Sequence, residues 1–126
     1  MSVQETCTAA VSTGALSATT TVYLVHGQSG EWKLTGLTIV PQAATAADGS
    51  NKYVLAFTDG SNTVATSHDT SSTALVAGTA QAMTLTTTAG SAHEFGATDA
   101  VNIVCTETGT QTMSVEIVAA FARVRV

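Results

Sequence analysis

The stretch Asp48–Asn62, DGSNKYVLAFTDGSN, decides the fold because it holds the same four residues, Asp-Gly-Ser-Asn, on either side of one short apolar run. Between the two copies, Tyr53, Leu55 and Phe57 occupy every second position, which is the period of a β-strand with one buried face. A strand over Lys52–Thr58 is about 20 Å long at roughly 3.3 Å per residue. The two loops are therefore expected at opposite ends of a sheet.

The two Asp-Gly-Ser-Asn loops are predicted to be turns rather than parts of a metal site. They lie too far apart to share an ion, and neither has the D-x-[DN]-x-[DN]-G spacing of a calcium-binding loop. Asp-Gly supplies a positive φ and side-chain hydrogen bonds to the backbone, while Ser and Asn begin the next segment. The second copy, between Phe57 and Val64, is predicted to form the turn of a β-hairpin.

The rest of the chain repeats this pattern of short strands and turns. Thr, Val, Ile and aromatic residues occur in short runs separated by Gly, Asp, Ser and Asn, which is typical of strands rather than helices. The expected strands are Thr21–His26, Glu31–Val40, Lys52–Thr58, Asn62–Ser67, Ala82–Thr88, Ala100–Glu107 and Thr112–Val126. We predict an all-β protein that forms a single antiparallel β-sandwich of about seven or eight strands.

The strand over Glu31–Val40 is expected to change phase in its middle. The apolar residues after Gly36 are one step out of register with Trp32 and Leu34 before it. A glycine at such a change predicts a β-bulge or a bend between sheets. Pro41, the only proline, is expected to end the strand.

Composition and charge limit what the protein can bind. The length of 126 residues fits one domain with its own core. Charged residues make up 10% of the chain and hydrophobic residues 44%, so hydroxyls, methyls or other protein must cover the surface. Four Lys and Arg and a net charge of -5 argue against a nucleic-acid partner. The sequence has no long apolar run, and its start, MSVQETC, does not resemble a signal peptide, so we expect cytoplasmic synthesis and no membrane partner.

Each end of the chain has two interpretations. Residues 1–20, MSVQETCTAAVSTGALSATT, contain few large apolar residues and little charge. They are expected to form either an N-terminal arm that orders on a neighbouring subunit or an extra edge strand of the sandwich formed by residues 21–126. At the other end, the apolar residues change parity after Phe121. The RVRV tail, residues 123–126, is expected to pair in a sheet or contact a partner, or else to be an ordinary last strand at the domain edge.

The sequence offers no group of residues that supports catalysis. Ser67, His68 and Asp69 are the residue types of a hydrolase triad, but neighbours in an extended chain point to opposite faces. His26, His68 and His93 lie in separate segments, and only a symmetric oligomer could bring such histidines to one ion. The sequence contains no P-loop, dinucleotide-binding motif or nucleophile elbow. We predict no enzymatic activity, no cofactor and no metal site.

The cysteines and the aromatic residues are expected to be packing residues. Cys105 alternates with Val101 and Ile103, as a small core residue does, and a protein of cytoplasmic origin is not expected to pair it with Cys7. The aromatic side chains are expected to fill the core or an interface rather than to stack on a sugar.

The sequence resembles small Thr/Ala/Gly-rich virion proteins of tailed bacteriophages in the succession TTTVYLVHGQSGEWKLTGLTIV, DGSNKYVLAFTDGSNTVATS, ALVAGTAQAMTLTTT and EFGATDAVNIVCTETGTQTMSVEIVAAF. It is similar in particular to head decoration (cement) proteins with a jelly-roll β-sandwich. The likeness covers roughly residues 20–122 and rests on the order of the elements. GATDAV (Gly96–Val101) matches the entry to a core strand of such domains, and MSVEIVAAF (Met113–Phe121) matches the closing strand.

This resemblance implies a non-enzymatic protein, commonly a homotrimer, on the outside of a capsid. Its partner would be the major capsid protein, whose subunits it would hold together against the pressure of packaged DNA. Its place would be the surface of the virion, after synthesis in the host cytoplasm. Contacts of about 800 Å² per partner would suffice, because tying three copies together gives each later contact a high effective concentration. The residues expected at these interfaces are Val3, Thr6, Trp32, Arg123, Val124, Arg125 and Val126.

Two other functions are compatible with the same composition. A receptor- or carbohydrate-binding module of a phage fibre or tail would need an exposed aromatic residue beside a carboxylate, for instance Trp32 with Glu31 or Asp69. A structural component of the tail or neck would share the charge-poor β composition and would differ in its place on the particle.

Overall fold

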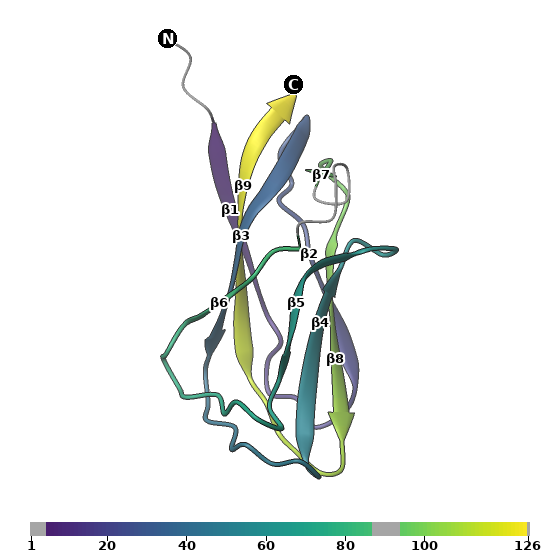
Figure 1. The fold of residues 1–126 in the computed structure, drawn as a ribbon. Coiled ribbons are helices and arrows are strands. Elements are labelled where there is room, and N and C mark those ends of the chain that lie inside the picture. The colour runs from purple at the N-terminus through teal and green to yellow at the C-terminus, as the bar shows by residue number, and fades with distance from the viewer. Residues whose placement is uncertain (1–4, 87–93, 126) are drawn as a thin grey trace.

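The protein is a β-sandwich in the computed structural model, which describes residues 5–86 and 94–125 (Figure 1). The strands are β1 (Thr6–Ser12), β2 (Thr20–Leu24), β3 (Glu31–Pro41), β4 (Lys52–Thr58), β5 (Thr63–Asp69), β6 (Gln81–Met83), β7 (Glu94–Phe95), β8 (Val101–Thr108) and β9 (Val115–Arg125). They form two antiparallel sheets that pack against each other, so the predicted all-β sandwich is confirmed. Within the described residues, no helix is long and apolar enough to cross a lipid bilayer.

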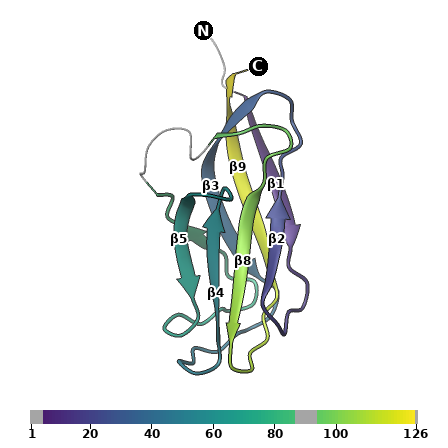
Figure 2. The ribbon, with the colours of Figure 1, turned by 90° about the vertical axis from the view of Figure 1, so that its right-hand side faces the viewer.

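The order of the strands follows from one long hairpin that has been rolled up. Strand β4 pairs with β5, β3 with β6, β2 with β8 and β1 with β9, so the pairs are nested around the β4–β5 turn. One sheet has the order β1-β9-β3-β6, with β7 also paired to β3, and the other has the order β2-β8-β4-β5 (Figure 2). Successive nested pairs alternate between the sheets, which is the arrangement of a jelly roll.

The core lies between the two sheets and is built by alternation along the strands. In β4, the side chains of Tyr53, Leu55 and Phe57 are all fully buried, while the residues between them are half-exposed. In the opposite sheet, β3 and β9 supply the facing apolar residues, among them Ile39 and Phe121. Burial of such side chains stabilises the fold by about 1.5–3 kcal/mol each.

The two Asp-Gly-Ser-Asn segments are turns at opposite ends of β4, as the sequence predicted. In each copy the Asp carboxylate accepts hydrogen bonds from the backbone N–H groups of the Ser and the Asn, at 2.8 and 3.1 Å for Asp48 and at 2.9 and 2.6 Å for Asp59. The second copy is the β4–β5 hairpin turn, where Gly60 has φ +102°. Both loops therefore use their carboxylates to close the turn.

The phase change predicted in β3 is also present. The pairing of β3 with β9 shifts in register between Leu34 and Gly36. Because of this bulge, Leu37 and Ile39 point to the same buried face as Trp32 and Leu34. The strand ends at Pro41.

Some elements differ from the expected ones. Strand β6 ends at Met83, whereas a strand over Ala82–Thr88 was expected; residues 87–93 lie outside the described part. After Met83 the chain leaves β3 and crosses to β5 in the other sheet, where the N–H of Thr66 donates to the carbonyl of Thr84 at 2.8 Å. This crossing closes that side of the sandwich. The two-residue strand β7 was not predicted at all.

The N-terminal strand β1 lies at the edge of the five-stranded sheet. Its seven residues pair with β9 without a break in register, from Thr6 opposite Ala122 to Ser12 opposite Glu116. The odd-numbered residues of β1 are half-buried against the core, and the even-numbered ones are exposed. Residues 6–12 are thus an edge strand of the same sandwich.

Candidate functional site

The ends of β1, β3 and β9 come together at one end of the five-stranded sheet (Figure 1). There Thr6 of β1 lies opposite Ala122 of β9, and Trp32 of β3 lies opposite Arg123 of β9. We call Glu5, Thr6, Trp32, Arg123 and Val124 the terminal corner.

The terminal corner contains four of the residues predicted at an interface. Thr6 and Val124 are exposed, and Arg123 is half-buried. The backbone of Arg125 pairs with Glu31 in β3. Val3 and Val126 lie outside the described residues. The RVRV tail is thus the end of a paired strand as far as Arg125.

Trp32 is a core residue, which corrects its predicted place at an interface. Its side chain is 2% exposed, and its indole N–H donates to the carbonyl of Ser29 at 2.9 Å. The guanidinium carbon of Arg123 lies 4.7 Å from the centre of its ring and covers one face. Asp69, the carboxylate suggested as its partner, lies on β5 of the other sheet. Trp32 therefore offers no open ring face on which a sugar could stack.

Arg123 is held at the terminal corner by an ion pair as well as by the ring. Its Nε lies 3.4 Å from Oε1 of Glu5. This Nε is buried and has no hydrogen bond to a described residue, so the contact with Glu5 is electrostatic in character and lacks hydrogen-bond geometry. Burial raises the pKa of the nearby Cys7 thiol, and the positive charge of Arg123 opposes that rise. At the terminal corner the cation of Arg123 thus lies beside the carboxylate of Glu5, and the thiol of the neighbouring Cys7 stays protonated at neutral pH.

The Ser-His-Asp sequence does not form a catalytic line. Ser67 is exposed, whereas the side chain of His68 is buried and its Nε2 lies 3.3 Å from the carbonyl oxygen of Thr73. The carboxylate of Asp69 accepts a hydrogen bond from the N–H of Ser71 at 2.8 Å and lies 3.9 Å from Nζ of Lys52, so its contacts are with residues other than the imidazole of His68. The hydroxyl, imidazole and carboxylate cannot transfer a proton along one line in this arrangement.

His26 has a structural role next to Trp32 and Phe121. Its Nδ1 accepts a hydrogen bond from the N–H of Gln28 at 2.9 Å, so Nε2 carries the proton and donates to the carbonyl of Phe95, also at 2.9 Å. Both ring nitrogens are occupied. Within residues 5–86 and 94–125, no three His, Cys, Asp or Glu side chains lie close enough together to hold a metal ion; His93 is outside these ranges.

Both thiols are free, and they lie in different sheets. Cys105 is fully buried in β8, as its alternation with Val101 and Ile103 predicted. Burial raises its pKa to about 11. Cys7 lies in β1 and is half-buried.

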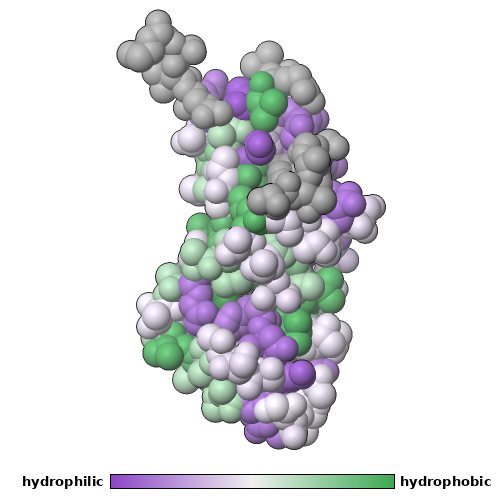
Figure 3. All heavy atoms as spheres, viewed as in Figure 1, coloured by the Kyte–Doolittle hydropathy of each residue, from purple (hydrophilic) through white to green (hydrophobic). Residues whose placement is uncertain are grey.

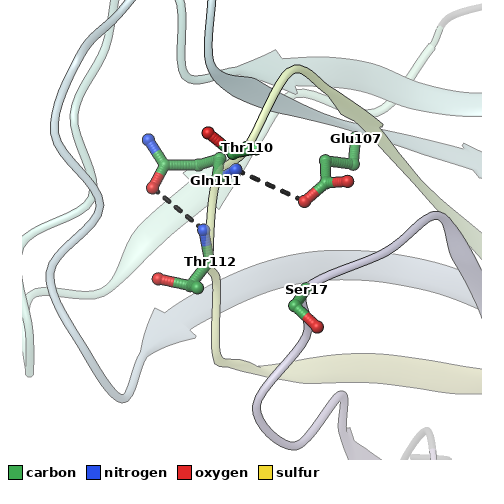
Figure 4. A pocket seen from close by; sticks show the side chains of 5 residues that line it. All are labelled: Ser17, Glu107, Thr110, Gln111 and Thr112. Atoms are coloured by element: carbon green, nitrogen blue, oxygen red, sulfur yellow. Dashed lines mark hydrogen bonds between the residues drawn. The ribbon is translucent and has the colours of Figure 1, made fainter.

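A pocket of about 260 Å³ lies between the β8–β9 turn and the segment that joins β1 to β2 (Figure 4). It is lined by Ser17, Glu107, Thr110, Gln111 and Thr112. The N–H of Gln111 donates to Oε2 of Glu107 at 3.3 Å, and the side-chain oxygen of Gln111 accepts from the N–H of Thr112 at 2.9 Å. This pocket could not be predicted from the sequence, because its residues come from separated segments of ordinary composition.

The chemistry available in this pocket is limited to hydrogen bonding. One carboxylate, one amide and three hydroxyls line it, without a cation, an imidazole or an aromatic ring. A single carboxylate has no second titratable group to act as its acid or base partner, and its negative charge disfavours phosphate. The pocket can therefore bind a small neutral or cationic polar group, but not an anion.

The outer face of the five-stranded sheet is a continuous surface of small side chains. Alternation and register place there the residues Thr8, Ala10, Gly36, Thr38, Ala82, Val118 and Ala120, which we call the uncharged face. Among the side chains that the structure describes, charged ones occur only towards its two ends, with Glu116 at one and Lys33 opposite Glu94 at the other. In Figure 3, which views the molecule as Figure 1 does, pale and light green surface covers a large area and purple patches lie within it.

Comparison with known proteins finds no protein-family model that matches this chain and no curated protein whose sequence matches it. The fold and the surfaces therefore carry the functional argument.

Proposed function

We propose that this protein is a non-enzymatic structural protein of a phage particle that decorates the outside of the capsid and holds neighbouring major capsid subunits together. The observation that carries this proposal is the uncharged face. It crosses β1, β9, β3 and β6 without a charged side chain among its seven residues. The cores of protein interfaces are likewise depleted of charged residues.

The composition of the uncharged face favours docking for a physical reason. Ala and Gly lose almost no side-chain entropy when they are covered, and Thr loses little. The face carries no charged side chain that a partner would have to strip of water, and this desolvation is the costly step when an ordinary protein surface is covered. A sheet face of this kind can therefore be covered by another protein at low cost, although each contact by itself is weak.

Several weak contacts suffice for a protein that bridges neighbours on a shell. Once one contact has formed, the next one is intramolecular and forms at high effective concentration. The rigid sandwich supports this mechanism, because its core fixes the position of the uncharged face relative to the terminal corner. No step in this function needs a nucleophile, a cofactor or a metal ion.

The test is cryo-electron microscopy of particles assembled with and without the protein, followed by adding the purified protein back. The expected result is density on the capsid exterior where subunits meet, and earlier DNA loss on heating when that density is missing. Density at the tail or neck instead would overturn the head location in favour of a tail component.

A pair of matched variants tests the surface. Thr38→Lys places a charge in the middle of the uncharged face, and Thr106→Lys places the same charge on the outside of β8 in the other sheet. We expect Thr38→Lys to weaken binding to particles at least about tenfold, because the lysine must be desolvated, and Thr106→Lys to bind like the parent. Equal binding of both variants would contradict the assignment of this face.

A further inference from the structure

The four edges of the two sheets are not equally protected. Strands β6 and β2 are short, with three and five residues. Strand β5 has two register irregularities against β4 and is covered by the segment after β6, through hydrogen bonds to Thr66 and Val64. Short length, irregularity and cover are the ways in which natural sheets prevent pairing at an edge.

Strand β1 has none of these protections. Its seven residues, TCTAAVS, contain no charge and no proline, and they pair with β9 in unbroken register. In an antiparallel pair of strands, every second residue directs both its N–H and its C=O group towards the paired strand, and the residues between direct theirs to the other side. The carbonyl of Glu5 accepts from the N–H of Arg123, and the N–H of Thr13 donates to the carbonyl of Val115, both at 2.9 Å. The odd-numbered residues thus bond to β9, and the even-numbered residues, from Thr6 to Ser12, direct their N–H and C=O groups away from the sheet.

The same side of the sandwich has an incompletely covered core. Cys7, Ala9, Val11, Leu16 and Val22 pack against the core but remain partly exposed, and all lie on β1, on β2 or on the segment that joins them. On the opposite side Met83 and Leu85 are also partly exposed, but there the chain crosses between the sheets and pairs with β5. The β1 side therefore has both unpaired backbone groups and apolar side chains that gain from being covered.

We propose that a second copy of this chain covers this side, by antiparallel pairing of β1 with β1 about a two-fold axis at Ala9. This register pairs all seven residues of both strands and forms about eight new backbone hydrogen bonds. It joins the two five-stranded sheets into one continuous sheet, with both cores on the same side. Cys7 and Val11 of one copy then lie beside Val11 and Cys7 of the other, so the partly exposed apolar residues cover each other.

The occupant is a second copy because the strand is complementary to itself. Seven neutral residues create no like-charge contact when the strand is paired with its own reverse, in contrast to a strand with charged side chains. The contact is isologous, so it closes after two copies. Each chain has one unprotected edge among its described strands, and the pairing does not continue into a fibre. This two-fold contact differs from the trimer that the resemblance implies, and it does not depend on binding to a capsid.

Sedimentation of the purified protein over a range of concentrations tests the proposal. We expect a monomer–dimer equilibrium. The variant Thr8→Lys with Ala10→Lys sets lysines directly opposite each other in the proposed register and should raise the dissociation constant at least about tenfold. The variant Thr8→Lys with Ala10→Glu sets a lysine opposite a glutamate and should retain the dimer. Thr38→Lys, on the same face but on β3, is the control and should also dimerise.

A disulfide tests the register itself. Residues 7 and 11 of different copies form a non-hydrogen-bonded pair in this arrangement, with Cα atoms about 4.5 Å apart, within the range that a disulfide spans. Val11→Cys should therefore give a covalent dimer through the native Cys7 on mild oxidation, and Cys7→Ser in the same chain should abolish it. Thr106→Cys should give no covalent dimer.

A monomeric parent protein at the highest attainable concentration would overturn the proposal. So would a dimer that the double lysine variant leaves intact. If the protein is a monomer and binds particles, the proposed function stands and the β1–β1 contact is wrong. If the protein is a dimer and binds no particle, the contact stands and the proposed function is wrong.

Discussion

Gly109, in the β8–β9 turn, is expected to be the least replaceable glycine of the described chain. It has φ +72°, and a Cβ atom added there would run into the carbonyl oxygen of Ser50 and lie close to Asn51. Asn51 in turn accepts hydrogen bonds from the N–H and the hydroxyl of Thr110 at 2.8 and 3.2 Å. Gly109→Ala must therefore strain the turn and also displace the segment that anchors it.

The chain offers a matched control in Gly14, which has a similar φ of +66° but nothing within 4 Å of an added Cβ. Gly14→Ala should cost only the left-handed conformation, about 1 kcal/mol. Gly109→Ala should cost that amount and the overlap, which is typically about 1–3 kcal/mol, so about 2–4 kcal/mol in total. For a domain of this size each kcal/mol lowers Tm by roughly 4 °C.

Urea unfolding and thermal melting of the two variants beside the parent protein measure this difference. We expect a Tm lower by about 4 °C for Gly14→Ala and by roughly 8–16 °C for Gly109→Ala. Equal losses would refute the reasoning, because they would mean that the close approach of Ser50 costs nothing and that the positive φ alone matters.

Three further predictions concern single side chains. Hydrogen bonds from the backbone N–H groups of Ser50 and Asn51 hold the pKa of the Asp48 carboxyl below its ordinary value. The unfolded chain then binds the proton more readily, so the stability from this group is present above about pH 4 and is lost as the pH falls through the folded pKa. The difference in unfolding free energy between the parent and Asp48→Ala should accordingly shrink between about pH 5 and pH 2, and a constant difference would contradict the turn assignment. Cys105, with its pKa raised to about 11 by burial, should resist a thiol reagent at neutral pH in the folded protein, while the half-buried Cys7 reacts at protein concentrations too low for the proposed β1–β1 dimer; equal labelling rates would show that the β8 core is open. Arg123→Ala should shift the fluorescence of Trp32, the only tryptophan, to the red and make it accessible to acrylamide; an unchanged spectrum would mean that the guanidinium does not shield the ring.

The sequence predicted those elements whose cause is local. Strand β4 has its predicted bounds, because strict alternation between two turn signals leaves only one register for Lys52–Thr58. The bulge at Gly36 could be predicted for the same reason, since a change of phase in an apolar pattern needs an extra residue. Hydrogen bonds within each Asp-Gly-Ser-Asn turn also depend on residues close in sequence.

Elements that depend on distant residues could not be predicted. Strand β7 has two residues and exists only because Phe95 lies opposite Trp32 in β3. The burial of Trp32 depends on Arg123, some ninety positions away in the sequence. An arginine among valines suggests an exposed, alternating tail when it is considered alone. In the folded chain it faces the same side as Phe121 and covers an aromatic ring.

The proposed surfaces escape sequence analysis for a related reason. A catalytic site contains residue types that are costly to bury, such as paired carboxylates or a histidine beside a nucleophile, so its residues can be recognised in the sequence. A docking face of Thr, Ala and Gly has the same residue types as any solvent-facing strand. A free edge has no characteristic residue types, because its binding groups belong to the backbone. Register and topology distinguish them: the uncharged face exists because β1, β9, β3 and β6 align small residues in rows, and the free edge exists because β1 comes last in its sheet. A shift of β1 by one residue against β9 would exchange its half-buried and exposed side chains. It would move Cys7, Ala9 and Val11 to the outer face without changing a single charge, so the residue composition alone does not determine what this surface presents.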